Sequence, residues 1–340
     1  MRLPRIFLAF SLIAPCASAL AAGPPIEIAL PGGEAGIGFD DLRYSPSLGK
    51  VMAPAGRTGS LDLIDPSSRE VTVIGGFQAQ GKFGGGHGEG TTSVDEGDGY
   101  LFATDRTSKT VNVIDPRERR IVTSAGLAAG PDYVRYVAPT RELWVTEPDS
   151  DRIEIFRLEG TRPPRPVHSA FLAVKGGPES LVVDAARGRA YTNLWEDRTL
   201  AIDVMSRSIL ERWNNGCTGS RGIALDGNRN FVFAACAEGK AVVLDAAHGG
   251  KILGSATSGS GVDIIDYDPK LGHLYFPGAQ SQTLAILSVS REGKLSLLGT
   301  TPTAASAHCV VSDQHGNAYV CEPKRGRLLV IRDSHAPSAP

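Results

Sequence analysis

The chain has 340 residues, of which 41% are hydrophobic and 21% are charged, so it is long enough for one large domain or two ordinary ones. Its 40 glycines and 22 prolines are typical of many short strands joined by turns. The formal net charge of −2 excludes a general attraction to nucleic acid or anionic membranes, although a local basic patch could still bind either.

The N-terminus predicts an export signal. Arg2 and Arg5 precede an apolar run over 6–14, and small residues follow up to Ala19-Leu20-Ala21. This order is that of a secretory signal peptide, which we assign to residues 1–21. The apolar run is shorter than the roughly 20 residues that a membrane span needs. Pro15 fits poorly before a lipidated Cys16. We therefore expect a cleaved protein in the periplasm or outside the cell, without a membrane span.

A repeated pattern begins after the signal and is clearest in residues 219–256. Four short apolar runs occur there, at 222–225, 230–234, 241–244 and 251–254, separated by Gly, Asn, Asp or Glu-Gly. This spacing predicts a four-stranded antiparallel meander. The residue that ends each innermost strand recurs about every 40–50 positions, which is the period of a propeller blade. These seven markers are Ser45, Asp95, Ala138, Asp184, Asp226, Asp268 and Asp313.

A second series of seven markers, at the end of each third strand, gives the same period. A β-sandwich would not produce a fixed long repeat, so we predict an all-β, seven-bladed β-propeller with four-stranded antiparallel blades over residues 22–334. These markers are Asp65, Asp115, Arg157, Asp203, Asp245, Ser288 and Arg332.

The last blade is one strand short. It offers strands at 309–312, 318–321 and 328–331, and residues 335–340 (HAPSAP) predict a disordered tail. We expect residues 26–30 to supply the missing outer strand and to close the ring. A closed ring has no edge that demands a partner, so we expect a monomer.

Four cysteines remain after the signal. Cys217 opens an inner strand and Cys236 ends its neighbour, and Cys309 and Cys321 have the same relation in the last blade. Because the start of one antiparallel strand faces the end of the next, we predict disulfides Cys217–Cys236 and Cys309–Cys321. A metal site or free thiols are the alternatives.

Several strands share their wording, such as YLFATD (100–105), LWVTEP (143–148), LDLIDP (61–66) and VNVIDP (111–116). These segments resemble the YVTN repeat, and the whole chain resembles the YncE-like family of exported seven-bladed propellers. Gly130-Pro131-Asp132, Gly177-Pro178-Glu179 and His87-Gly88 resemble the family's blade entrances. The resemblance implies the fold. It implies no common reaction, and some family members are reported to bind DNA.

Polar residues stand where the inner strands begin, around the mouth of the predicted channel. Carboxylates and histidines that converge there could bind a divalent cation or a small polar ligand. Alternatively, they cap loop amides and line a water-filled channel. An exposed Trp195 in a neighbouring loop could stack on a ligand or pack over the next blade. The candidate binding residues are Asp40, His87, Glu89, Asp132, Glu179, Trp195, Arg221, Asp263 and His308.

Three functions are compatible with this ring. The first is a non-catalytic scaffold that binds a small polar ligand or a protein partner at the channel mouth, and it requires these side chains to face the channel. The second is a metal-dependent hydrolase, such as a lactonase, or a lyase, with His87 or His308 as general base. The third is single-stranded DNA binding, which needs a basic groove with aromatic side chains. No nucleophile motif is present, and the glycine-rich 84–90 stretch precedes a strand rather than the helix of a phosphate loop.

Overall fold

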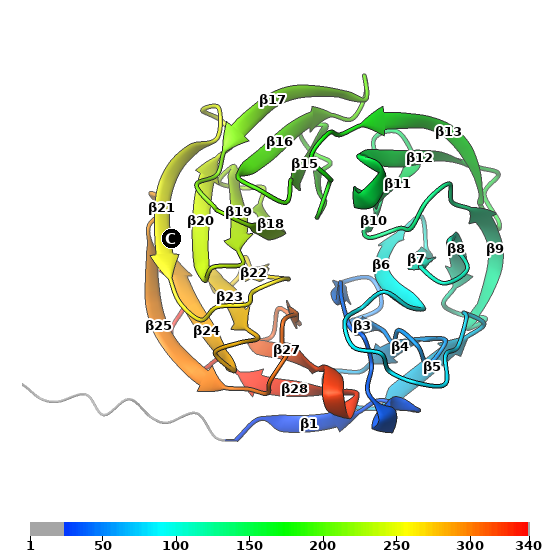
Figure 1. Cartoon of the computed structure of the whole chain (residues 1–340), viewed down its shortest axis with the longest axis horizontal. Coiled ribbons are helices and arrows are strands. Elements are labelled where there is room, and N and C mark those ends of the chain that lie inside the picture. The colour runs from blue at the N-terminus through cyan, green and yellow to red at the C-terminus, as the bar shows by residue number, and fades with distance from the viewer. Residues whose placement is uncertain (1–23, 339–340) are drawn as a thin grey trace, which may run out of the picture.

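Seven four-stranded antiparallel sheets stand around a central axis in the computed structural model, which describes residues 24–338 (Figure 1). The predicted all-β, seven-bladed propeller is confirmed. The signal-peptide prediction falls on residues 1–21, outside the described part of the chain. None of the helices within residues 24–338 is long and apolar enough to span a bilayer.

The blades follow one another along the chain, and each runs from the channel outward. Blades one to three are β2 (Arg43–Ser45), β3 (Lys50–Pro54), β4 (Ser60–Ile64), β5 (Val71–Gly75); β6 (Thr91–Gly97), β7 (Tyr100–Asp105), β8 (Thr110–Asp115), β9 (Arg120–Gly126); and β10 (Val134–Val137), β11 (Glu142–Glu147), β12 (Arg152–Glu159), β13 (Arg165–Ala173). Blades four to six are β14 (Val182–Asp184), β15 (Arg189–Asn193), β16 (Arg198–Asp203), β17 (Ser208–Asn214); β18 (Ser220–Asp226), β19 (Phe231–Cys236), β20 (Lys240–Asp245), β21 (Lys251–Thr257); and β22 (Asp266–Asp268), β23 (His273–Gly278), β24 (Thr283–Val289), β25 (Leu295–Pro302). Blade seven holds β26 (Val310–Ser312), β27 (Asn317–Glu322), β28 (Arg327–Arg332) and β1 (Ile26–Ala29), and short 3-10 helices lie at η1 (Gly33–Ala35), η2 (Pro148–Ser150) and η3 (Pro323–Arg325).

The recurring aspartates owe their spacing to turns. Asp65 Oδ1 accepts hydrogen bonds from the backbone N–H groups of Ser67 and Ser68. Asp226 Oδ1 likewise accepts from the N–H groups of Asn228 and Arg229. A short carboxylate that bonds to backbone two or three residues ahead stabilises a tight turn. The two marker series are therefore the turns that end the first and third strands.

The N-terminal strand closes the ring, as predicted. β1 pairs antiparallel with β28, and Ile26 faces Val330 while Ala29 faces Arg327. In Figure 1 the blue β1 lies directly outside the red β28. Blade seven is thereby completed by residues from both ends of the chain.

The C-terminal segment follows a defined path through residue 338, although its composition predicts a disordered tail. Asp333 Oδ2 lies 2.7 Å from Nδ1 of the buried His273 of blade six and accepts a hydrogen bond from the Tyr275 hydroxyl. Ser338 N–H donates to the Leu271 carbonyl over 2.7 Å. These contacts are made to a blade distant in sequence, so composition gives no sign of them.

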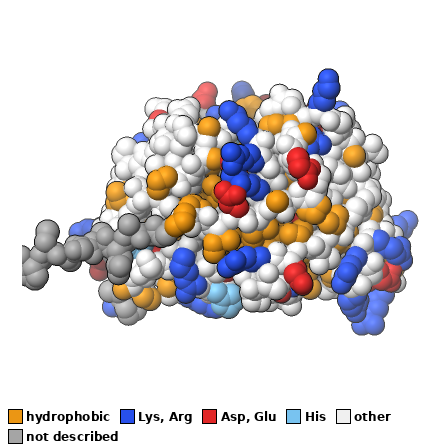
Figure 2. Space-filling model, turned by 90° about the horizontal axis from the view of Figure 1, so that it is seen from below, with side chains coloured by type: hydrophobic (Ala, Val, Ile, Leu, Met, Phe, Trp, Pro, Cys, Tyr) orange, Lys and Arg blue, Asp and Glu red, His pale blue; other side chains and the backbone are white. Residues whose placement is uncertain are grey.

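The core lies between neighbouring blades. Phe102 of blade two stacks on Tyr136 of blade three, and Phe233 of blade five stacks on Tyr267 of blade six. The outer strands leave hydrophobic side chains exposed, and such side chains are visible between Lys and Arg in Figure 2. The exposed hydrophobic residues on outer strands are Ile26, Val73, Phe171, Leu210, Ile252 and Leu297. Packing between the inner three strands therefore carries most of the core.

Both predicted disulfides are formed, Cys217–Cys236 and Cys309–Cys321. Each joins the start of an inner strand to the end of its neighbour. In an oxidising compartment such bonds restrict the unfolded chain, and their short loops limit the gain to a few kcal/mol each.

The contribution of β1 to ring closure can be measured with a matched pair of substitutions. Ile28 is 6% exposed and Ile26 is 41% exposed on the same strand. Ile28→Ala should lower the free energy of unfolding by roughly 2–5 kcal/mol because it leaves a cavity under blade seven. Ile26→Ala should cost less than about 1 kcal/mol. Urea denaturation followed by circular dichroism gives both values, and equal losses would show that β1 does not pack as described.

Candidate functional site

The predicted entrance residues gather at the face where the inner strands begin. Asp40, Asp132, Glu179, Asp263 and His308 lie in the segments just before β2, β10, β14, β22 and β26, and Arg221 lies within β18. Blade two departs from this pattern, because β6 begins at Thr91 and His87 comes from the preceding loop. His87 nevertheless reaches the channel mouth, whereas Glu89 is an exposed side chain of that loop.

Arg106, which lies outside the predicted set of binding residues, ties two of the carboxylates together. Arg106, in the turn after β7, places Nη2 3.2 Å from Oδ2 of Asp40 and donates to Oδ1 of Asp132. Asp40 and Asp132 are both buried. The Arg106 guanidinium thus neutralises buried negative charge on both carboxylates. A lone arginine in a turn has no distinguishing motif, so only the ring geometry reveals this role.

His87 joins the same cluster from the glycine-rich loop. Its Nδ1 lies 2.9 Å from Oδ2 of Asp40, although not in line for a well-directed hydrogen bond, and its Nε2 lies 3.7 Å from Oδ2 of Asp263. The negative charge of Asp40 raises the pKa of His87 to about 9, against the opposing effect of burial. Burial alone would raise the pKa of Asp40, but His87 and Arg106 together lower it. At neutral pH the two groups therefore form an ion pair.

Glu179 occupies the other side of the mouth. Trp195 Nε1 donates to its Oε2, and Nε of Arg221 lies 3.7 Å from its Oε1. Burial raises the pKa of Glu179 to about 8, and the charge of Asp263 adds to the rise. Trp195 is 40% exposed and packs over Gly177, where an added Cβ would lie 3.3 Å from the ring. Trp195 thus packs on its neighbour and still presents part of its indole to solvent.

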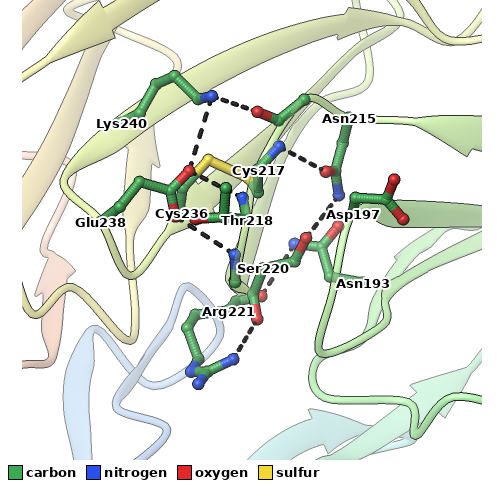
Figure 3. The surroundings of a disulfide bond; sticks show 12 residues. Asn193, Asp197, Asn215, Cys217, Thr218, Ser220, Arg221, Cys236, Glu238 and Lys240 are labelled. Carbon is green, nitrogen blue, oxygen red and sulfur yellow. Dashed lines mark hydrogen bonds and ion pairs between the residues drawn. A yellow bond between two sulfur atoms is a disulfide. The ribbon is translucent and has the colours of Figure 1, made fainter.

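The disulfide of blade five positions Arg221 (Figure 3). Next to Cys217–Cys236, the Glu238 carboxylate accepts hydrogen bonds from the N–H groups of Thr218 and Gly219, at 2.9 and 3.3 Å. The segment that leads to Arg221 is thus held by the disulfide bond and by the two hydrogen bonds to Glu238. The backbone that carries Arg221 is therefore held beside the mouth, and Nη1 of the guanidinium donates to the Ser220 carbonyl over 2.7 Å.

Both ring nitrogens of His308 lie within hydrogen-bond distance of backbone carbonyl oxygens. Its Nδ1 lies 2.7 Å from the Ser306 carbonyl oxygen and its Nε2 lies 3.0 Å from the Phe39 carbonyl oxygen. Its ring stacks on His87 with centroids 5.8 Å apart. His308 therefore joins blade seven to the segment before blade one and supports the position of His87.

A pocket of about 460 Å³ opens between these groups. Its charged and polar lining includes His87, Arg221, Asp263 and Lys324, and its apolar lining includes Phe83 and Val262. Asp263 is the carboxylate that faces this pocket, with its side chain 20% exposed and its nearest cation at 3.7 Å. The pocket thus presents one carboxylate and three basic side chains, His87, Arg221 and Lys324, against an apolar wall.

The donor atoms of Asp40, His87 and Asp132 cluster closely enough to suggest a metal site. The Arg106 guanidinium already lies between the two carboxylates, and a metal ion would have to displace it. Two other clusters contain cysteines, but their sulfur atoms are bonded to each other. The described residues therefore do not fit a divalent cation at these positions.

Below the mouth lies a buried ion pair. Arg135 of β10 binds Asp41 through Nη1–Oδ2 at 2.6 Å and Nη2–Oδ1 at 2.9 Å, and its Nε donates to the Leu181 carbonyl over 2.8 Å. Arg135 and Asp41 are both buried. We call this buried ion pair, which joins blades one, three and four below the mouth, the plug. In the sequence, the only sign of this ion pair is that Arg135 stands between apolar residues of a predicted inner strand.

No family model matches the chain, and no curated protein matches it by sequence. The YncE-like resemblance therefore stays a prediction. Solved structures share the fold. A chain from the "Crystal Structure of Mitotic Checkpoint Complex" has a TM-score of 0.73 at 15% identity, with 97% of this chain and 99% of that chain covered.

Two further structures are similar over most of the chain. "Kuenenia stuttgartiensis Hydrazine Synthase" has a TM-score of 0.72 at 13% identity, covering 94% of this chain and 99% of that chain. The "Myceliophteria_thermophila Cps50 (Swd1) beta-propeller domain" has a TM-score of 0.70 at 11% identity, covering 89% and 98%. At these identities the likeness establishes the propeller fold alone.

The buried plug gives a direct stability prediction. Arg135→Met leaves the Asp41 carboxylate buried without its partner and should lower the free energy of unfolding by about 3–5 kcal/mol. Arg120→Met is the control, because Arg120 and Glu118 pair on the exposed surface and should contribute less than about 1 kcal/mol. Guanidinium denaturation measures both variants. Similar small losses would show that the plug does not hold the blades together.

The raised pKa of Glu179 predicts how stability depends on pH. Its folded pKa of about 8 lies above the ordinary 4.5, so the unfolded chain releases this proton first as the pH rises. Glu179 should therefore reduce stability progressively between pH 4.5 and 8. Glu179→Gln should make the fall in unfolding free energy over that interval shallower. Denaturation at a series of pH values tests this, with Glu159→Gln on the exposed rim as control. An unchanged slope would contradict the prediction.

Proposed function

We propose that the protein is a non-catalytic binding scaffold that holds a small polar ligand, or a polar group of a protein partner, in the channel-mouth pocket. The supporting observation is the pocket itself, where Asp263, Arg221 and Lys324 face a common space of about 460 Å³ beside an apolar wall. Volumes of this order are usual for small-molecule sites.

The ligand chemistry follows from which charges remain available. Asp40 and Asp132 are engaged with Arg106, so they position the mouth and do not meet a ligand directly. Asp263 retains capacity to accept hydrogen bonds, while Arg221 and Lys324 retain capacity to donate them. A ligand with a donor group and an acidic or acceptor group, such as a zwitterion, is complementary to both.

The setting we propose is the periplasm or the cell exterior, and the family we propose is the YncE-like propellers. The signal-like N-terminus and the two disulfides support export. The YVTN-like strand wording supports the family. The structural neighbours include a component of a complex and a protein named as a synthase, so the fold itself favours neither binding nor catalysis.

The alternatives have less support. Arg106 stands where a catalytic metal would bind between Asp40 and Asp132, which weakens the hydrolase or lyase hypothesis. Single-stranded DNA would need stacking aromatics along a basic groove. The mouth pocket offers Phe83 as its aromatic side chain, and Asp263 adds a negative charge.

Ligand-observed NMR with a panel of amino acids, amino sugars and hydroxy acids tests the proposal. At least one zwitterion should bind. Asp263→Asn and Arg221→Gln should each weaken that binding by about tenfold or more, because each removes a charged hydrogen bond. Asp263→Asn keeps the side-chain shape, and Arg221→Gln shortens a side chain that is one-third exposed, so both variants should keep a melting temperature close to that of the unmodified protein.

His248→Gln is the matched control, because His248 is 75% exposed on a turn between β20 and β21, away from the pocket. It should bind like the unmodified protein. The proposal fails if no member of the panel binds, or if binding is the same in all three variants.

A further inference from the structure

A second chamber lies beyond the Arg135–Asp41 plug, at the face where the inner strands end. It has a volume of about 420 Å³ and two unlike walls. Blades four to seven line it with apolar side chains, including Val183, Ile223, Ile265 and Val311. Blades one to three supply most of its charged side chains, together with Leu42 and three tyrosines, and blade six adds Asp266. The chamber is therefore amphipathic across its width.

Most of the carboxylates in this chamber already have partners. Asp41 is bound by Arg135. Asp95 lies 3.3 Å from Nη2 of Arg43 and accepts the Tyr136 N–H over 2.8 Å. Glu96 accepts hydrogen bonds from the hydroxyls of two serines of blade one. These groups need no further ligand.

Glu96 and Asp266 are the two carboxylates of this chamber that have no cation within ion-pair distance among the described residues. Of these two, Asp266, on β22, is the one that stands beside the apolar side chains of blades five to seven. Its Oδ2 accepts hydrogen bonds from the N–H and hydroxyl of Ser312, at 2.7 and 2.8 Å. Within residues 24–338, no Lys, Arg or His side chain lies within ion-pair distance of this carboxylate. Arg43 acts on it only from farther away, and burial raises its pKa. A carboxylate at an apolar wall without a cation is costly unless something neutralises it.

We propose that this chamber is a second binding site, which takes an amphipathic organic cation with its ammonium group on Asp266 and its apolar body against blades four to seven. The charge balance favours a cation, because the lining of the chamber as a whole carries four carboxylates and two arginines; these are Asp41, Asp95, Glu96, Asp266, Arg43 and Arg135. A metal ion is a poorer occupant, since Mg²⁺ or Ca²⁺ needs several oxygen ligands and the opposite wall offers hydrocarbon.

This site is separate from the mouth pocket and does not rest on the proposed function. The buried Arg135 side chain reaches Asp41 of blade one and the Leu181 carbonyl of blade four, and so it stands between the two spaces. A ligand in one chamber makes no contact with the charged groups of the other. Variants of Asp263 and Asp266 can therefore distinguish the two proposals.

Isothermal titration with 2-phenylethylamine at neutral pH is the test, with 2-phenylethanol as an uncharged analogue of similar shape. The ammonium compound should bind at least about tenfold more tightly than the alcohol. Asp266→Asn should remove that preference, since the amide can still accept from Ser312 but carries no charge. Asp263→Asn, in the mouth, should leave the affinity for the amine unchanged.

A second variant keeps the test decisive if Asp266→Asn does not fold. Val183 is half-buried in the chamber lining, and Val183→Phe should narrow the space beside the apolar side chains and weaken binding without altering any charge. The proposal is overturned if the amine does not bind, if it binds no better than the alcohol, if Val183→Phe binds as before, or if Asp263→Asn abolishes binding.

Discussion

The ion pair between Arg135 and Asp41 is the interaction on which the interior of this propeller depends. Two charges that leave water need close, well-directed partners, and the bidentate contact with an added bond to a backbone carbonyl supplies them. The pair connects blades one, three and four across the axis. The pair lines the chamber at the far face and not the mouth pocket, and the two cavities share no lining residue.

At the channel mouth, ion pairs within the protein decide which charged side chains stay available to bind a ligand. An acidic ring read from sequence suggests a cation site, since four carboxylates converge on one point. In the folded protein Arg106 and protonated His87 neutralise Asp40 and Asp132, and the pKa of Glu179 rises until it holds a proton at neutral pH. The groups that face the pocket are one carboxylate, Asp263, and several basic side chains. The chemistry of the mouth pocket is therefore set by Asp263, Arg221 and Lys324, and not by the whole ring of acidic residues.

The predictable parts of the fold are those set by contacts between residues that are close in sequence. Turn aspartates such as Asp65 and Asp226 act on backbone two or three residues away, so their spacing reveals the blades directly. The ring closure and both disulfides then follow from antiparallel geometry. Arg106, Arg135 and the path of the C-terminal segment were not predictable in this way. Each depends on contacts between blades that are far apart in sequence, and no local pattern specifies which partner an isolated arginine will meet.

The pairing of β1 with β28 also sets the order in which the molecule can be completed. Among the strands within residues 24–338, β1 is synthesised first and β28 last, so blade seven cannot form until residue 332 has been made. Contacts of such long sequence separation carry a large loop-closure cost and form slowly. Until then, the edge of blade one and the isolated β1 strand remain without neighbours. During synthesis the blades therefore form an incomplete ring. The ring can close, and fold as one cooperative unit, only when β28 is present to pair with β1.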